Sequence, residues 1–226
     1  FACVGADKDV EEISVGNNGG FSAMHSGAVF VDHTTASPAL ARALHEKGQG
    51  RGIGVLDAPV SGGEAGALNA QLTIMAGGDA PYFDIAAPVM DCYAKQIGLI
   101  GPAGSGQLTK AVNQICIAGI VQGLSEALHF SQAAGLDGEK VLNVISRGAA
   151  QSWQMDNRAQ TMLKGEFDFG FAVDWMRKDL GIVLEEARSL GIALPQTALV
   201  DQFYADVQAM GGGRQDTSSL IRRFRG

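Results

Sequence analysis

Lys110 and two amides within the following helical turn are the residues of this sequence best placed to do chemistry. Residues 104–114 read GSGQLTKAVNQ, and residues 115–124 are almost wholly apolar. On a helix, positions i, i+3 and i+4 share one face, so Lys110, Asn113 and Gln114 would form one polar patch. The lysine either extends its apolar stem so that its charge reaches solvent, or it is placed to exchange a proton with a ligand.

Two glycines just before this lysine predict an anion site. Gly104 and Gly106 would let a ligand approach the helix closely, and a helix N-terminus favours anions. Lys110 would then lie in the second turn, near the bound acid group. The alternative is a surface lysine on an amphipathic helix, which is the usual place for a single lysine. The company of Asn113 on an otherwise apolar helix favours the functional interpretation.

A second loop combines a hydroxyl with a flexible backbone. Residues 57–63 read DAPVSGG and follow an apolar run at 52–56. Ser61 followed by Gly62 and Gly63 would expose successive backbone N–H groups, which suit a carboxylate or a phosphate. The alternative is a plain glycine-rich turn.

Three other polar positions are weaker candidates. Thr34 and Thr35 follow an apolar run and would either contact a cofactor or cap the helix that begins near Pro38. Lys178 lies in the segment WMRKDL, where the charges on either side also suit a solvated position. No histidine has a partner at metal-ligand spacing, so we expect no metal.

The elements that must position these residues differ between the two halves of the chain. The first hundred residues alternate apolar runs with helical stretches, which predicts an α/β fold with a mainly parallel, doubly wound sheet. The predicted strands are 2–4, 28–31, 52–56, 72–76 and 97–100. From residue 106 the pattern is helical, with predicted helices ending near 135 and at 138–146, 152–163, 173–189 and 195–210. The change near residue 104 predicts a domain boundary.

Composition argues against several classes of protein. The chain has 226 residues and a net charge of −7, which disfavours nucleic acid as a partner, and its basic run at 222–225 is short. Three cysteines lie far apart and match no metal or disulfide spacing. We therefore expect that the thiols are buried and that the protein is cytoplasmic, where thiols stay reduced. No uncharged apolar stretch reaches about 18 residues, so we expect no membrane span.

One motif expected of such a fold is missing. A doubly wound domain of this type usually opens with a strand and a G-x-G-x-x-G loop, and here no such loop follows a strand. We therefore expect that the numbering begins inside a longer protein, or that the chain is a fragment without the pyrophosphate site.

Together the motifs resemble the β-hydroxyacid dehydrogenase family, which includes 3-hydroxyisobutyrate dehydrogenase, tartronate semialdehyde reductase and glyoxylate/succinic semialdehyde reductase. Residues 57–63 are similar to the family's substrate-binding signature and residues 104–113 to its catalytic signature. Residues 32–38 resemble its D-x-S-T-x-x-P loop and residues 178–180 its K-D-L segment. The sequence departs from the family pattern with a threonine at position 34 instead of serine and a glycine at position 5 instead of proline.

The resemblance implies a Rossmann-type domain that uses NAD or NADP, followed by an all-α domain. The implied catalytic residue is Lys110. The implied substrate-binding residues are Ser61, Gly62, Gly63 and Asn113. The implied cofactor-binding residues are Val4, Thr35 and Lys178. Residues 1–104 would form the C-terminal part of the dinucleotide-binding domain, and residues 105–226 the helical domain for substrate and oligomerisation.

The implied reaction transfers a hydride between the nicotinamide and a short 3-hydroxy acid or semialdehyde, with Lys110 as proton donor and acceptor. The implied partners are a small carboxylate or aldehyde-acid substrate and further copies of the chain in a homo-oligomer. Two alternatives remain. The chain would be a truncated, non-catalytic oligomerisation or regulatory module, or it would decarboxylate its substrate as 6-phosphogluconate dehydrogenase does, which needs a basic phosphate clamp.

Overall fold

A computed structural model describes residues 1–224 of the chain. The chain divides into two compact units, residues 1–112 and 113–226, and the division falls inside the long helix α5 (Ser105–Ala133). Arg225, at the end of the basic run noted above, lies outside the described residues. The change of pattern predicted near residue 104 coincides with the beginning of α5.

The first unit is built on a five-stranded mixed sheet. Its strands are β1 (Val29–Asp32), β2 (Gly54–Asp57), β3 (Val60–Ser61), β4 (Leu72–Gly77) and β5 (Ala94–Gly101). The pairs β1–β2 and β4–β5 are parallel, whereas β4 runs antiparallel to both β2 and β3. The α/β class is confirmed, but the sheet is less parallel than the sequence pattern indicates. The reason is that β3 follows β2 almost at once and pairs with β4, with Val60 opposite Ile74.

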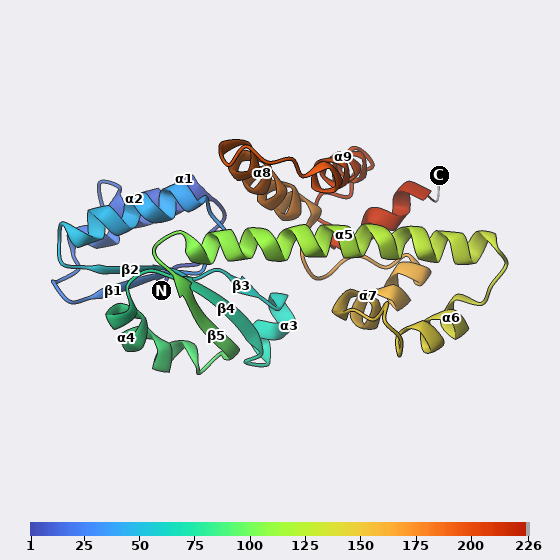
Figure 1. The fold of residues 1–226 in the computed structure, drawn as a ribbon, viewed down its shortest axis with the longest axis horizontal. Coiled ribbons are helices and arrows are strands. Elements are labelled where there is room, and N and C mark those ends of the chain that lie inside the picture. Colours follow the sequence, from blue (N-terminus) through green and yellow to red (C-terminus); the bar gives the residue numbers. More distant parts are fainter. Residues whose placement is uncertain (225–226) are drawn as a thin grey trace. The chain divides into compact units, whose positions relative to one another are not determined.

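Helices cover both faces of this sheet. They are α1 (Asp7–Val15), α2 (Pro38–Gln49), the short α3 (Gly63–Leu68) and α4 (Ala80–Met90). Phe30 and Val55 pack in one core cluster with residues of α1 and α2, whereas the neighbouring Val31 and Leu56 pack in another with residues of α4. Alternate residues of a strand point to opposite faces, so the sheet is doubly wound. Figure 1 shows α2 and α4 on opposite sides of it.

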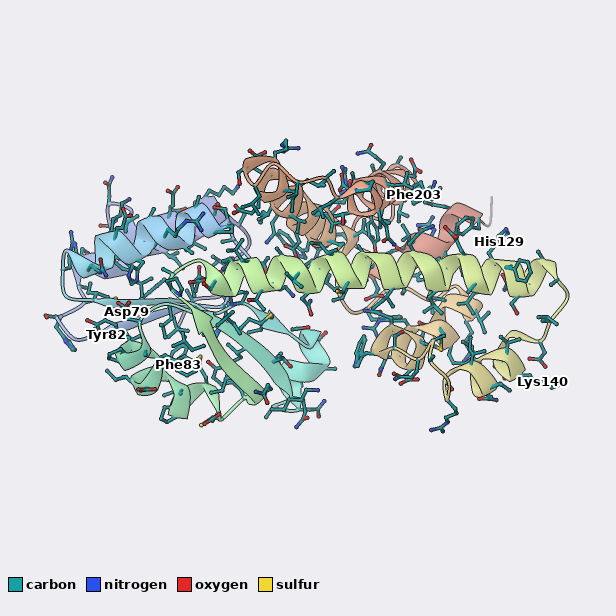
Figure 2. The ribbon with its side chains drawn as sticks, in the orientation of Figure 1. Asp79, Tyr82, Phe83, His129, Lys140 and Phe203 are labelled. Carbon is teal, nitrogen blue, oxygen red and sulfur yellow. The ribbon has the colours of Figure 1, made fainter. Side chains whose placement is uncertain are left out.

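The sheet and α4 approach each other closely at one point. A Cβ atom added to Gly54 of β2 would clash with the ring of Tyr82, so this glycine lets the aromatic side chain lie directly on the strand. Figure 2 labels Tyr82 with Asp79 and Phe83 at the beginning of α4. Asp79 precedes the helix, but its side chain makes no capping hydrogen bond.

Two local predictions are wrong. Residues 2–4 form no strand but one isolated parallel bridge between Ala2 and Asp32. The ladder ends there because the Val4 amide donates to the Thr34 hydroxyl, at 2.9 Å, instead of to a strand carbonyl. The thiols predicted to be buried are exposed at all three cysteines, including Cys116 on the outer face of α5.

The elements described in the second unit are helical, as predicted. They are the rest of α5, α6 (Gly138–Ile145), α7 (Trp153–Lys164), α8 (Val173–Ser189), α9 (Pro195–Ala209) and the 3₁₀ helix η2 (Thr217–Phe224). The residues of α8 that face its core include Met176, Leu180 and Val183, which keep the 3-and-4 spacing of a buried face.

Aromatic side chains hold η2 against the other helices of this unit. The ring of His129 on α5 stacks on Phe224 at 5.0 Å between centroids. The guanidinium of Arg223 lies 3.6 Å from the centroid of Phe203 on α9. His129 and Phe203 are labelled in Figure 2. These contacts add to the apolar burial of Leu220 and Ile221 from η2.

Helix α5 is long and apolar enough to cross a membrane, judged by length and composition alone. The criterion of about 18 consecutive uncharged residues excluded this helix, because Lys110 interrupts its apolar stretch. A core helix of a globular protein meets the same two criteria. Ala118, Val121 and Leu128 of α5 are buried in the core clusters of the second unit.

Candidate active site

Lys110 is buried in the first unit, with 7% of its surface exposed. Its ammonium group donates a hydrogen bond to the carbonyl oxygen of Val60 at 2.9 Å. The charge therefore does not extend to solvent in the manner of a surface lysine. Since Val60 directly precedes Ser61, the structure brings Lys110 to the beginning of the predicted substrate loop.

That loop has a backbone that favours glycine. Ser61 belongs to β3 and pairs with Thr73, and the chain then turns sharply at Gly62, with φ of 130°, and at Gly63, with φ of 60°. Both glycines are exposed, and α3 begins at Gly63. Two successive residues with positive φ are rare without glycine, so the sequence and the turn agree. The loop presents its backbone to solvent one residue away from the lysine's hydrogen-bond acceptor.

The beginning of α5 does not have the role predicted for it. Asp57, at the end of β2, accepts hydrogen bonds from the amides of Gly104, at 2.8 Å, and Gln107, at 2.9 Å. A Cβ atom at Gly106 would clash with the backbone carbonyls of Asp57 and Met75. Gly106 therefore admits strands β2 and β4, Gly104 lies against Pro38 and Arg42 of α2, and the anion at the helix N-terminus is the chain's own carboxylate. The prediction of a ligand site there was wrong.

Gln107 is a positioning residue that the sequence interpretation missed. Its buried side chain donates from Nε2 to the Thr34 carbonyl at 2.7 Å and accepts at Oε1 from the Ala36 amide at 3.0 Å. The two bonds hold the loop that carries Thr35 against α5. A side-chain amide offers both a donor and an acceptor in one planar group, which was the available sequence signal.

The loop that contains Thr34 and Thr35, the threonine loop, contacts the segment that contains Val4. The Thr34 hydroxyl accepts the hydrogen bond from Val4, so it is not a helix cap. Ser37 has that role, because its hydroxyl accepts from the Leu40 amide at 3.1 Å. Ala2 and Asp32 form a parallel bridge, and Val4 and Thr35 follow them on the same two segments. Both residues are half-buried.

Asp32 is a buried carboxylate at the end of β1. Its Oδ1 accepts from the Thr34 amide at 2.9 Å, and 5% of its surface is exposed. Burial raises the pKa of Asp32 to about 6, the Thr34 hydrogen bonds oppose that rise, and the nearby charges of Asp57 and Asp7 add to it. Burial also raises the pKa of Asp57, against the stabilising bonds from the α5 amides.

His33 links the threonine loop to the substrate loop. Its Nδ1 lies 2.6 Å from the Ala58 carbonyl and its Nε2 lies 2.8 Å from the Tyr93 hydroxyl. A carbonyl only accepts, so Nδ1 carries the hydrogen and Nε2 accepts from the tyrosine. Burial lowers the pKa of His33 and raises that of Tyr93 to about 12, so both groups are neutral at pH 7. No motif pointed to this pair.

In the second unit, Asn113 begins a chain of polar contacts. Its Nδ2 donates to Gln114 Oε1 at 2.8 Å, and Gln114 Nε2 donates to Asp179 Oδ2 at 2.6 Å. The other carboxylate oxygen of Asp179 lies 3.3 Å from the ammonium of Lys178. Lys178 also lies 5.6 Å from the ring centroid of Trp175. Lys178 is therefore held by an anion and an aromatic ring, which is unlike a solvated charge.

Among residues 1–224, no group of three or more histidine, cysteine, aspartate or glutamate side chains is arranged to hold a metal ion. In the first unit the candidate residues are Lys110 and the backbone of the Ser61 loop, and in the second unit they are the polar chain that begins at Asn113.

Two family models match consecutive parts of the chain. Residues 1–101 match the NAD-binding domain of 6-phosphogluconate dehydrogenase. Residues 104–224 match the domain described as NAD-binding of NADP-dependent 3-hydroxyisobutyrate dehydrogenase.

Individual proteins give the same result. An uncharacterized oxidoreductase of Shewanella frigidimarina is 60% identical over 224 residues, which cover 99% of this chain and 77% of that protein. The 2-hydroxy-3-oxopropionate reductase of Escherichia coli is 36% identical over 98% of this chain and 76% of its own length. The crystal structure of 3-hydroxyisobutyrate dehydrogenase from Salmonella typhimurium superimposes with a TM-score of 0.87 at 28% identity, covering 98% of this chain and 77% of that one.

Proposed function

This chain belongs to the β-hydroxyacid dehydrogenase family, and from that premise we propose that it serves hydride transfer between NAD or NADP and a short 3-hydroxy acid or semialdehyde. The observation that carries the proposal is the buried Lys110 ammonium, 2.9 Å from the Val60 carbonyl at the edge of the Ser61 loop. A buried cation beside an exposed, glycine-rich backbone suits an acid substrate with a reacting oxygen.

The residues at the end of β1 fit a nicotinamide. In open α/β sheets, ligands bind beyond the carboxyl ends of the strands, which is where Val4 and Thr35 lie. Val4 offers an apolar contact for one ring face, and Thr35 offers a hydroxyl for the ring amide. Gln107 and the Thr34 hydroxyl hold the two segments in place. We assign Lys178 as a third cofactor contact, in the second unit.

Lys110 would move the proton. When a semialdehyde is reduced, Lys110 donates a proton to the carbonyl oxygen, and when a hydroxy acid is oxidised it accepts the proton of the hydroxyl. Its positive charge stabilises the alkoxide character that develops on that oxygen. The Val60 carbonyl orients the ammonium group. The amides of Ser61, Gly62 and Gly63 would bind the substrate carboxylate, and Asn113 would bind a further polar group of the substrate.

The test is a panel of four substrates with each reduced cofactor. Glyoxylate, succinic semialdehyde, methylmalonate semialdehyde and tartronate semialdehyde are mixed with NADH or NADPH, and absorbance of the reduced cofactor is followed. We expect turnover of at least one semialdehyde. No turnover, together with unchanged Trp153 and Trp175 fluorescence on addition of either cofactor, would contradict the proposal and favour a non-catalytic module.

We also propose that the chain forms a homo-oligomer. Helix α5 exposes Ile120 and Phe130 in the second unit, at 40% and 71% of their surfaces, and water-exposed apolar side chains of this size suit a subunit interface. Sedimentation equilibrium should give a mass that is a multiple of that of the chain. A monomer at micromolar concentration would contradict this proposal and leave the catalytic one intact.

A further inference from the structure

The short segment from Ala58 to Ser61 joins β2 to the predicted substrate loop, and its two edges have different partners. The Met75 amide of β4 donates to the Pro59 carbonyl at 3.1 Å, so this carbonyl faces the sheet. Carbonyl groups alternate between the two edges of an extended chain, so those of Ala58 and Val60 both face away from β4. Since β3 ends the sheet order, no strand within residues 1–224 pairs with this outer edge.

Two side chains occupy the outer edge in place of a strand. His33 Nδ1 lies 2.6 Å from the Ala58 carbonyl oxygen, and Lys110 Nζ lies 2.9 Å from the Val60 carbonyl oxygen. Ala58 is fully buried, and a buried carbonyl without a partner costs free energy. Loss of the His33 bond would therefore favour rotation of this peptide group toward another donor. The rotation would reach Val60, which is two residues further along the chain.

His33 itself is held firmly at the end of β1. Its backbone amide donates to the Ala2 carbonyl at 2.8 Å, and the carbonyl of the preceding Asp32 accepts from the Ala58 amide at 2.7 Å. The Tyr93 hydroxyl lies 2.8 Å from His33 Nε2. By donating to Nε2, the tyrosine leaves the ring hydrogen on Nδ1, which faces the Ala58 carbonyl. The backbone and the tautomer together direct one N–H group at the segment before Ser61.

We propose that His33 is a positioning residue for Lys110. Its bond to the Ala58 carbonyl fixes the peptide groups as far as Val60, and the Val60 carbonyl then orients the ammonium group for proton transfer. The inference rests on the proposed function and deepens it, because it names a residue on which the proton donor depends. A misplacement of about 1 Å can cost about 10²-fold in rate, so the bond should affect turnover strongly.

The test compares two replacements of the same shape. Asparagine in His33→Asn carries an N–H donor on the atom next to Cγ, where Nδ1 lies, whereas leucine in His33→Leu has the same branching and no polar atom. Both variants lose the ring and its bond to Tyr93, so the amide group alone distinguishes them. Reduction of the semialdehyde that the wild type uses best is measured with saturating cofactor, and circular dichroism at the assay temperature establishes that each variant is folded.

The loss should appear in kcat of one variant only. In His33→Leu we expect kcat to fall by about 10- to 10²-fold, and in His33→Asn we expect kcat to stay within about threefold of the wild type. KM for the cofactor should change less than about threefold in both, because the bonds of Thr34 and Gln107 hold the threonine loop independently of the His33 ring. Equal losses of kcat in His33→Asn and His33→Leu would assign the effect to packing of the ring and would overturn the inference.

His25→Leu is the control for removal of a histidine from the same unit. His25 Nδ1 also lies near a backbone carbonyl, that of Ser26, at 2.9 Å, but this contact is exposed and lies outside the substrate loop. The variant should turn over at the wild-type rate. A loss in His25→Leu as large as that in His33→Leu would show a general effect on the unit and would contradict a specific role of His33.

The tautomer of His33 gives a readout that does not depend on activity. Burial lowers the pKa of His33, so the ring is neutral at pH 7. In ¹⁵N NMR spectra at this pH, the signals that disappear in His33→Asn should show a protonated Nδ1 and an unprotonated Nε2. A ring protonated at Nε2 instead would place the Nδ1 lone pair against the Ala58 oxygen, and the inference would fail.

The outcomes separate the inference from the function on which it rests. If the wild type reduces a semialdehyde and kcat of His33→Leu is within a few-fold of the wild type, the inference is overturned and the dehydrogenase function stands. If the wild type reduces no semialdehyde with either cofactor, the proposed function fails and the inference fails with it.

Discussion

Replacing Asp32 by asparagine should change how the stability of the protein depends on pH. Asp32 is 5% exposed, and burial raises its pKa from 3.8 to about 6. The folded state therefore holds the proton more tightly than the unfolded state does. It follows that the contribution of Asp32 to stability is fully present where Asp32 is protonated in both states, below about pH 4, and is lost as pH rises through 6.

The magnitude follows from the shift. A rise of about two pKa units corresponds to about 3 kcal/mol of unfolding free energy in all, and about 2.5 kcal/mol of it is lost between pH 4 and pH 8, because the unfolded Asp32 is already partly ionised at pH 4. Asparagine keeps an oxygen that can accept from the Thr34 amide but does not ionise. The unfolding free energy of Asp32→Asn minus that of the wild type should therefore become more positive by about 2.5 kcal/mol over this range. Any constant cost of packing the new amide cancels in the change.

The assay is urea unfolding followed by circular dichroism at pH 4, 5, 6, 7 and 8. Asp84→Asn, at an exposed position of α4, is the control, and its difference from the wild type should stay nearly constant over the range. A difference for Asp32→Asn that is equally flat would refute the reasoning, because it would show that the folded and unfolded states bind the Asp32 proton equally well.

Three further predictions concern the same unit. Gln107→Leu should destabilise the protein by about 2–4 kcal/mol in urea unfolding, because it leaves one backbone carbonyl and one amide buried without partners. Gly106→Ala should cost more than about 2 kcal/mol, because its Cβ clashes with two backbone carbonyls, whereas Gly123→Ala on the same helix has open space and should gain about 0.5–1 kcal/mol. The His33 ring should titrate below pH 6.5 in NMR spectra, and the contribution of His33 to stability should fall as pH drops below 6.5, because the unfolded chain takes up a proton that the folded state excludes.

The sequence predicted the α/β class, the all-helical second half and most helix limits because these follow from periodicity. Short apolar runs marked β2 and β4, and α8 kept the predicted limits of 173–189. The lack of a strand at 2–4 was not predictable in this way, because the pairing of Ala2 goes no further once the Val4 amide donates to the Thr34 hydroxyl. No periodic pattern encodes a bond between residues 30 positions apart.

In the candidate site, too, the sequence predicted some features and not others. The family motifs implied that Lys110 and the Ser61 loop act on one substrate, and in the structure the Lys110 ammonium donates to the Val60 carbonyl, next to Ser61. The roles of Asp57 and Gln107 depend on how β2 packs against the beginning of α5, which brings together groups about 50 positions apart. From the sequence alone, Gly104 and Gly106 suggested room for a ligand, because the strand that fills the space was not visible in the local pattern.

The most direct test of the central claim is turnover by Lys110→Ala with the semialdehyde that the wild type reduces best. A positioned proton donor contributes about 10²- to 10⁴-fold, so kcat should fall by at least 10² while KM for the cofactor changes little. Lys140→Ala, at an exposed lysine of α6, should turn over at the wild-type rate, and added methylamine should restore part of the activity of Lys110→Ala. A kcat for Lys110→Ala within a few-fold of wild type would contradict the assignment of Lys110 as the proton donor.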